Sequence, residues 1–208
     1  MQEVFVGTVH RRFEGDRLVL ATHNQGKLRE LRALLGPLGV AVTDAGEAGL
    51  GAPEETGTTF EANAILKAHA ACEATGLPAL ADDSGLGVDA LGGDPGVVSA
   101  RWAGPDGDHA PAIARVLAGL EGRDDRRARF VCVLALAWPD GHVETSRGEA
   151  PGTIASAPRG QGGFGYDPIF VPDGETRSFA ELTPEEKRAD NHRARALAGL
   201  MRDVFGAG

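Results

Sequence analysis

The chain of 208 residues carries a formal net charge of −9, with 42% apolar and 25% charged side chains, which is ordinary for one globular domain. The acidic balance argues against broad nucleic-acid binding, and the longest apolar run, FVCVLALAW, is too short to span a membrane. The N-terminus lacks the pattern of a signal peptide, and Cys72 and Cys132 sit in apolar segments without zinc-site spacing, so we expect a cytoplasmic protein with reduced core thiols.

The first part of the chain predicts an extension, a strand and a helix. Residues 1–17 form an N-terminal extension in which VFVGTV suits a short strand at a sheet edge, and a single domain is expected at 18–208. LVLA at 18–21 is a short apolar strand. The helix after it has one apolar face, formed by Leu28, Leu31, Leu34 and Leu35. Asn24 is its expected N-cap and Gly36-Pro37 its end.

The second part predicts a helix followed by two strands. Thr58 and Glu61 form a capping-box pattern that opens a helix through Ala74, and Gly76 and Pro78 end it. The strand PALAD then ends at a pair of aspartates, and GLGVDAL is expected to be a separate return strand.

The rest of the chain predicts a helix, a hairpin and a closing helix. The helix occupies 110–120 with Pro111 in its first turn. RFVCVLALAW is typical of a strand buried on both faces, and a Pro139-Asp140-Gly141 turn joins it to its partner HVETSRGEA. A glycine-rich loop precedes the strand PIFV, and Thr183 and Glu186 form a capping box that starts the last helix. Its buried face is formed by Leu197, Leu200, Met201 and Val204. This order predicts an α/β fold with a mixed β-sheet flanked by helices.

Basic side chains are unevenly divided between two residue types. Eighteen of the 21 are arginine, and the three lysines are Lys27, Lys67 and Lys187. A lysine is a compact charge on a flexible stem, which suits a phosphate oxygen. Chance on solvated helix faces explains any one lysine, but three together beside acidic and glycine-rich segments favour a polyphosphate site.

The segment THNQGK joins a strand to a helix N-terminus. Backbone N–H groups point outward at such a junction, and the helix dipole favours an anion there. Gly26 allows the backbone to come close, and Thr22 and Lys27 add donors. When the loop is taken alone, a capped helix start with a surface lysine explains it better.

Acidic residues are paired in two further segments. In ADDSG, Asp82 and Asp83 need a positive partner, and Mg²⁺ is suitable because it takes oxygen ligands and keeps waters. One of the two aspartates can then act as a base on a water, whereas a simple turn after the strand is the alternative. Glu54 or Glu55 in PEETG can supply a second carboxylate to the metal.

The segments GGFGYDP and KRADNHR carry the residue types of a base pocket. Phe164 can stack on a base, Asp167 can accept from a base or ribose, and the Tyr166 hydroxyl can hold the loop. His192 and Arg193 are donors that suit a keto oxygen on a purine, although surface charge explains this pair without the other segments.

Five segments, in order, resemble the inosine triphosphate pyrophosphatase family, also called dITP/XTP pyrophosphatases. They are LVLATHNQGK at 18–27, FEANAILKA, LADDSGLGVDALGGDPGVVSARWAG, GGFGYDPIF and LTPEEKRADNHRARAL. The resemblance implies a long mixed sheet with two lobes and a central cleft. It also implies Mg²⁺-dependent hydrolysis of noncanonical purine nucleoside triphosphates (ITP, dITP, XTP) to the monophosphate and pyrophosphate, by a homodimer.

The resemblance implies roles for individual residues as well. Asp83 is the metal-binding proton acceptor, Lys67 faces the phosphates, Glu54 is the second acidic metal ligand, and Ser84 contacts the substrate. The triphosphate is held by Thr22, His23, Asn24, Gln25, Gly26 and Lys27. The nucleoside pocket is formed by Phe164, Gly165, Tyr166, Asp167, Lys187, His192 and Arg193.

The chain departs from the family pattern at two places. The extension at 1–17 has no counterpart in the simplest members, and Asp190-Asn191 stands where Ile-Ser commonly precedes His-Arg. Two other functions stay open: a non-catalytic nucleotide sensor, and a pyrophosphatase or nucleotidyl transferase acting on other nucleotides. Purines with a 6-keto group are expected because His192 and Arg193 would donate to O6, where adenine presents a donor of its own.

Overall fold

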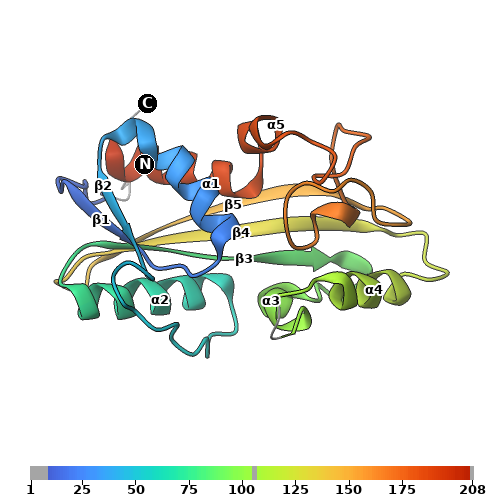
Figure 1. Cartoon of the computed structure of the whole chain (residues 1–208), viewed down its shortest axis with the longest axis horizontal. Coiled ribbons are helices and arrows are strands. Elements are labelled where there is room, and N and C mark those ends of the chain that lie inside the picture. The colour runs from blue at the N-terminus through green and yellow to red at the C-terminus, as the bar shows by residue number, and fades with distance from the viewer. Residues whose placement is uncertain (1–8, 105–106, 207–208) are drawn as a thin grey trace, which may run out of the picture.

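The computed structural model describes residues 9–104 and 107–206, which form a six-stranded mixed sheet covered by helices on both faces (Figure 1). The strand order is β2-β1-β3-β4-β5-β6. The strands are β1 Arg17–Leu20, β2 Ala41–Asp44, β3 Ala79–Val88, β4 Arg127–Ala137, β5 Val143–Ile154 and β6 Phe170–Pro172. β1 is parallel to β2 and β3, whereas the β3–β4, β4–β5 and β5–β6 pairs are antiparallel, so the expected mixed α/β sheet is confirmed.

Helices lie on the two faces of the sheet in separate groups (Figure 1). One group is α1 Gln25–Leu35, α5 Pro184–Ala189 and α6 His192–Leu200, and the other is α2 Phe60–Thr75, α3 Ser99–Trp102 and α4 Ala110–Gly119. None of the described helices is both long and apolar enough to cross a membrane.

Strand β4 shows how the sequence places these layers. Its successive side chains point to opposite faces, so Leu134 and Leu136 pack in the cluster with α1 and α6, while Val133 and Ala135 pack in the cluster with α2. Both sets are fully buried, which explains why this stretch is an uninterrupted apolar run. The prediction of a strand buried on both faces, paired with HVETSRGEA, is confirmed.

Strand β1 covers the outer edge of β3 only at its first two residues, Ala79 and Leu80. β1 ends at Leu20, opposite Leu80, whereas β3 continues to Val88. Within the described residues only the bridge between Gly87 and Pro95 pairs with this outer edge beyond β1. Side chains that follow Leu80 on β3 therefore lie beside a gap in the sheet, where both faces are accessible to the same ligand.

The predicted strand end at ADDSG is wrong. The structure has one continuous strand, β3, through Asp82, Asp83 and Ser84, and GLGVDAL is its continuation rather than a return strand. The prediction failed because two adjacent carboxylates were taken to need a turn. In the structure their charges are neutralised by cations from opposite faces of the sheet, so the backbone can stay extended.

Three smaller expectations also need correction. The N-cap of α2 is Thr59, whose hydroxyl accepts from Ala62 N, so the predicted box starting at Thr58 is wrong by one residue. The predicted last helix is two helices, α5 and α6, because Asp190 leaves helical geometry and Asn191 caps a new helix. Strand β2 was not predicted, since its four residues are exposed or half-buried and lack an apolar run.

Other local predictions are confirmed. Asn24 caps α1 through its side-chain oxygen, Gly76 ends α2 in the left-handed conformation, and Pro111 lies in the first turn of α4. Thr183 and Glu186 form the full capping box of α5. Cys72 and Cys132 are buried free thiols.

The described part of the N-terminal extension lies against the last turn of the chain. Phe13 N–H donates to Val204 O at 2.9 Å, and its ring lies 5.2 Å from that of Phe205. Arg11 N–H donates to the Glu144 carboxylate at 2.9 Å, near the start of β5. We call residues 9–13 the N-terminal strap. Of VFVGTV, only Val9 is described, and residues 9–16 contain no strand, so the expected edge strand falls mostly outside the described residues.

Candidate active site

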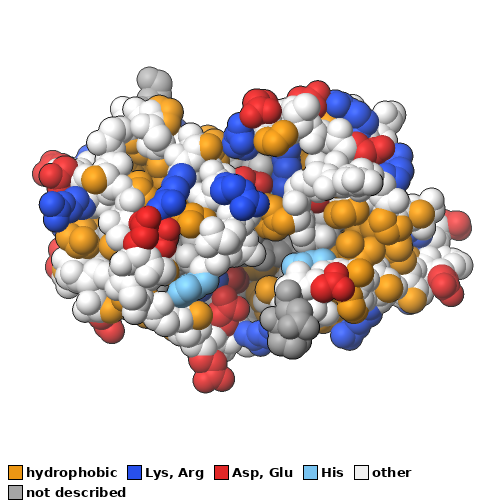
Figure 2. Space-filling view, viewed as in Figure 1, with side chains coloured by type: hydrophobic (Ala, Val, Ile, Leu, Met, Phe, Trp, Pro, Cys, Tyr) orange, Lys and Arg blue, Asp and Glu red, His pale blue; other side chains and the backbone are white. Residues whose placement is uncertain are grey.

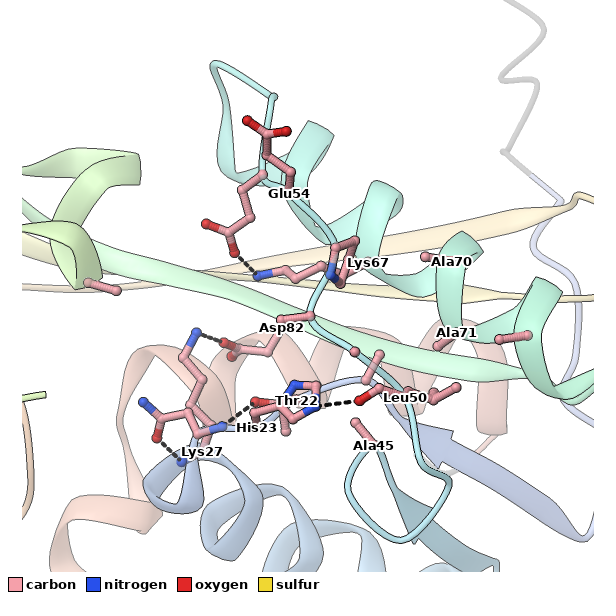
Figure 3. Close-up of a pocket in the computed structure, with 18 of the residues that line it drawn as sticks. Thr22, His23, Lys27, Ala45, Leu50, Glu54, Lys67, Ala70, Ala71 and Asp82 are labelled. Carbon is pink, nitrogen blue, oxygen red and sulfur yellow. Dashed lines mark hydrogen bonds and ion pairs between the residues drawn. The ribbon is translucent and has the colours of Figure 1, made fainter. Parts of the chain in front are cut away.

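A cavity of about 800 Å³ lies beside the free edge of β3. The loop after β1 lines it with Thr22, His23 and Asn24, α1 with Lys27, and the loop before α2 with residues 50–55 (Figure 3). Its other polar lining residues are Lys67 of α2, Asp82 and Arg101, and the rest of the lining is alanine. Figure 2 shows the surface hollowed near the middle of the molecule, with acidic and basic side chains around the hollow. The cavity therefore brings together segments that are far apart in the sequence.

The THNQGK loop is held by its own side chains. The Asn24 carboxamide oxygen accepts from the N–H groups of Gly26 at 2.9 Å and Lys27 at 3.1 Å, and Thr22 Oγ1 accepts from Asn24 N–H at 3.2 Å. The expectation that these N–H groups are free for an anion is therefore wrong for Gly26 and Lys27. His23 Nε2 lies 2.8 Å from Leu50 O, so its ring joins this loop to the loop before α2 rather than pointing at a phosphate. Gln25 is exposed.

Asp82 is the buried, fully neutralised member of the acid pair. Its side chain forms an ion pair with Lys27 of α1 and a second, at 2.8 Å, with Nε of Arg193 of α6. Cys132 and Ser84 also donate to it, at 3.0 Å each. Burial opposes the charge, yet Arg193 and Lys27 outweigh that cost and hold the pKa of Asp82 well below its usual range.

Asp83 points to the opposite face of β3, toward α2. Lys67 Nζ donates to its Oδ1 at 2.7 Å, and Asn63 Nδ2 donates to its Oδ2 at 3.5 Å. Burial raises the pKa of Asp83, and the ammonium groups of Lys67 and Lys27 offset this only in part. Asp83 itself is not among the residues that line the cavity, whereas its partner Lys67 is. A carboxyl group with a raised pKa is suited to accept a proton.

The acidic loop before α2 places its two glutamates differently. Glu55 binds Lys67 at 2.7 Å and lies 3.7 Å from Arg101, and these cations lower its pKa although burial acts against them. Glu54 also lines the cavity (Figure 3), and its carboxylate has no hydrogen bond or ion pair to any described residue. Of the two, Glu54 is therefore the one whose oxygens are available to a ligand.

The carboxylates on this side exceed the nearby cations. Glu54, Glu55 and Asp83 face Lys67 and Arg101, a set of three negative and two positive charges. In the described part of the chain, no three metal-ligating side chains converge on one point. Mg²⁺ commonly uses only one or two protein carboxylates together with substrate phosphates, so oxygen donors of this kind fit that ion.

The glycine-rich loop that carries Phe164 and Asp167, here called the aromatic loop, is held by a buried ion pair. Lys187 Nζ donates to Asp167 at 2.6 Å. The same nitrogen lies 4.6 Å from the centroid of the Phe164 ring. Asp167 also accepts from Phe164 N–H at 2.8 Å. A Cβ at Gly26 would lie 2.7 Å from the Phe164 ring, so glycine is needed there for the ring to rest against α1.

The remaining predicted residues are buried around this loop. Tyr166 O–H donates to Ser99 O at 2.9 Å, as expected for a hydroxyl that holds the loop, and burial raises the pKa of Tyr166 to about 12. Its neighbour Gly165 has a positive φ of 67°. His192 stacks on Phe130 with ring centroids 4.8 Å apart, and burial together with nearby cations lowers its pKa well below the usual range, so it is neutral.

Arg193 does not present a free guanidinium. Its Nε binds Asp82, one terminal nitrogen binds Glu30, and the other donates to Ser84 Oγ at 3.1 Å. Glu30 of α1 also lies 3.2 Å from Lys187. Sequence reasoning missed Glu30 because it is one polar residue among several on α1, and its burial shows only in the structure.

These contacts join the two halves of the predicted site. A chain of alternating charges runs from Lys27 through Asp82, Arg193, Glu30 and Lys187 to Asp167. The acid pair and the aromatic loop are thus connected through buried ion pairs, although Phe164 and His192 do not line the cavity itself.

The sequence profile of the Ham1 family matches residues 18–203. The chain belongs to this family. It is 56% identical over 201 residues to a protein of Rhodospirillum centenum named dITP/XTP pyrophosphatase, covering 95% of this chain and 99% of the relative. A Deinococcus deserti protein of the same name is 56% identical over 188 residues, covering 90% of this chain and 89% of the relative.

Solved structures of Ham1 proteins have the same fold. A HAM1 protein from Coxiella burnetii superposes with a TM-score of 0.82 at 46% identity, covering 89% of this chain and 96% of the other. A Staphylococcus aureus Ham1 protein gives a TM-score of 0.80 at 39% identity, covering 89% of this chain and 96% of the other. The resemblance stated from the five motifs is confirmed.

Proposed function

We propose that this Ham1 protein hydrolyses noncanonical purine nucleoside triphosphates, ITP, dITP and XTP, to the monophosphate and pyrophosphate. The observation that carries the proposal is the acid pair on β3, in which two neighbouring aspartates have opposite pKa shifts beside three cavity-lining cations. Environments that push two carboxyl pKa values apart are typical of a site with an assigned proton acceptor. The relatives named dITP/XTP pyrophosphatase support the substrate class.

Asp83 is the proton acceptor in this proposal. It takes a proton from a water whose oxygen attacks the α-phosphorus, and the bond from that phosphorus to the β-phosphate oxygen breaks. The electron pair of the broken bond leaves with pyrophosphate. Lys67, held 2.7 Å from Asp83, and Lys27 at the N-terminus of α1 are placed to bind phosphate oxygens as charge develops on them.

Mg²⁺ is the proposed cofactor, held by Asp83 and Glu54 together with the triphosphate. When bound, it supplies positive charge to the phosphate oxygens and balances the excess of carboxylates on this side of β3. Glu55 has a different role, because its carboxylate already binds Lys67 and so fixes the position of that ammonium.

Purine selectivity is proposed to arise around α6. Phe164 stacks on the base, and Asp167, Lys187 and His192 surround it with polar groups. Because the Arg193 guanidinium is occupied by Asp82, Glu30 and Ser84, it reaches O6 only by exchanging one of these partners. Adenine, with an amino group at that position, would leave a buried donor unpaired, which disfavours ATP.

Product analysis tests the proposal. Purified protein is incubated with ITP, XTP, ATP, GTP or dTTP, with and without Mg²⁺, and released pyrophosphate and orthophosphate are measured separately. We expect pyrophosphate from ITP and XTP in the presence of Mg²⁺, and little from ATP or dTTP. Tight ITP binding without turnover would favour a sensor, and equal turnover of dTTP would favour a pyrophosphatase of another specificity.

The remaining expectations from the resemblance complete the proposal. We propose a cytoplasmic homodimer in which residues 18–208 form one catalytic domain and residues 1–17 an extension. Light scattering of the eluting peak in size-exclusion chromatography tests the dimer.

A further inference from the structure

Asn63 is a fully buried amide on α2 that the proposed chemistry leaves without a role. Its side chain has 0% exposure and lies on the same face of the helix as Lys67, one turn earlier. A buried amide is costly unless both of its ends are hydrogen-bonded. Its two partners belong to the two acidic segments of the site.

The carboxamide oxygen of Asn63 holds the end of the acidic loop. It accepts from Gly57 N–H at 2.8 Å. The approach is so close that a Cβ at Gly57 would lie 2.5 Å from this oxygen and 2.8 Å from the Ala62 Cβ. The loop that carries Glu54 and Glu55 is therefore fastened to the first turns of α2 at this glycine.

The carboxamide nitrogen of Asn63 faces the proposed proton acceptor. It donates to Asp83 Oδ2 at 3.5 Å, while Lys67 donates to Oδ1 at 2.7 Å. Each oxygen of the carboxylate thus has one donor from α2. Lys67 alone would leave the carboxylate free to rotate about its bond to Cβ, and the second donor opposes that rotation.

We propose that Asn63 is a positioning residue that holds Asp83 and the acidic loop at 53–57 in fixed positions relative to each other. An amide does this without adding charge, because it offers an acceptor to the loop and a donor to the carboxylate. An aspartate of the same shape would put another negative charge beside Asp83, and an apolar residue would leave the half-buried Gly57 N–H without this acceptor. The inference rests on the proposed function for its kinetic consequences.

Two variants, Asn63→Ala and Asn63→Asp, test the role through steady-state kinetics with ITP and Mg²⁺. We expect kcat to fall by about 10–100-fold in both, which is the range for groups that orient a reacting residue. KM for ITP should change by less than about threefold because the phosphate and base contacts remain.

A control separates positioning from a loss of stability. Ala68→Gly lies on the same helix, is fully buried and does not touch Asp83, and it should lower Tm by about 2–4 °C without changing kcat. Values of kcat for Asn63→Ala within about twofold of wild type, or a loss explained by the unfolded fraction alone, would overturn the proposal.

Hydrogen exchange of the Gly57 amide, followed by NMR, reads the contact to the loop without turnover. Exchange should be at least about tenfold faster in Asn63→Ala than in wild type, because Gly57 N–H loses its acceptor. Unchanged exchange would refute the contact. If wild type released no pyrophosphate while faster exchange was observed in the variant, the proposed function would fail and the positioning contact would stand.

Discussion

The two aspartates of β3 differ in their partners much more than in their burial. Asp82 is 2% exposed and Asp83 is 5% exposed, yet the pKa of the first is lowered and that of the second raised. Asp82 binds two cations and two further donors, whereas Asp83 shares one lysine with Glu55. The charges that face a buried carboxyl group therefore help to decide whether its pKa is raised or lowered. Strand β3 places one aspartate of each kind beside the same gap in the sheet.

The largest effect that would test this comparison is the loss of turnover in Asp83→Asn. The amide keeps the shape of the carboxylate but cannot accept the proton, so kcat with ITP should fall by about 10²–10⁴-fold. Nucleotide binding measured by calorimetry should largely remain. A variant with a near-wild-type rate would mean that Asp83 is not the proton acceptor.

The second test is a change in stability at Asp82. In Asp82→Asn the buried guanidinium of Arg193 loses one of its two carboxylate partners, so the free energy of unfolding should fall by about 3–5 kcal/mol. Urea unfolding at pH 7 measures it. Because the folded pKa of Asp82 is lowered, its contribution is present above the unfolded pKa and is lost as the pH falls through the folded pKa.

A matched control is available on the surface. The Asp125 side chain is 40% exposed, and its ion-pair partner among the described residues is Arg127, two residues later. Asp125→Asn should leave the urea midpoint close to wild type. If Asp82→Asn and Asp125→Asn lost the same free energy of unfolding, the buried ion pairs of Asp82 would contribute no more to stability than this surface pair does.

The smallest expected effect is a displacement of the titration of Asp83 in the metal-free protein. Because burial raises its folded pKa, the Asp83 carboxyl group should take up its proton at a higher pH than an ordinary aspartate does. Carbon-13 NMR of the carboxyl carbon measures this without Mg²⁺, since a bound cation would itself lower the pKa. A midpoint in the range of an unperturbed aspartate would remove the contrast between the two residues.

The sequence predicted well those elements whose signals are local. The Asn24 cap, the Thr183–Glu186 capping box and the β4–β5 hairpin each depend on neighbouring residues, and each is confirmed. The mixed sheet followed from the order of these elements. The family motifs also contain Lys27, Lys67 and Asp82, which the structure brings to one cavity.

Features that depend on distant partners were missed or misread. The strand through Asp82 and Asp83 requires Arg193, which lies 111 residues from Asp82 in the sequence, and no local pattern contains that information. Glu30 and Asn63 were overlooked for the same reason, since each acquires its role from residues on other elements. The expectation of free N–H groups at Gly26 and Lys27 failed because Asn24 uses one oxygen for both.

The N-terminal strap has a consequence for the order in which the protein is made. The ribosome synthesises Phe13 191 residues before its hydrogen-bond acceptor, Val204. Arg11 is likewise made 133 residues before Glu144, which lies near the start of β5. The nascent chain can assemble β1, β2 and α1 early, yet the strap closes only after Val204 has left the ribosome.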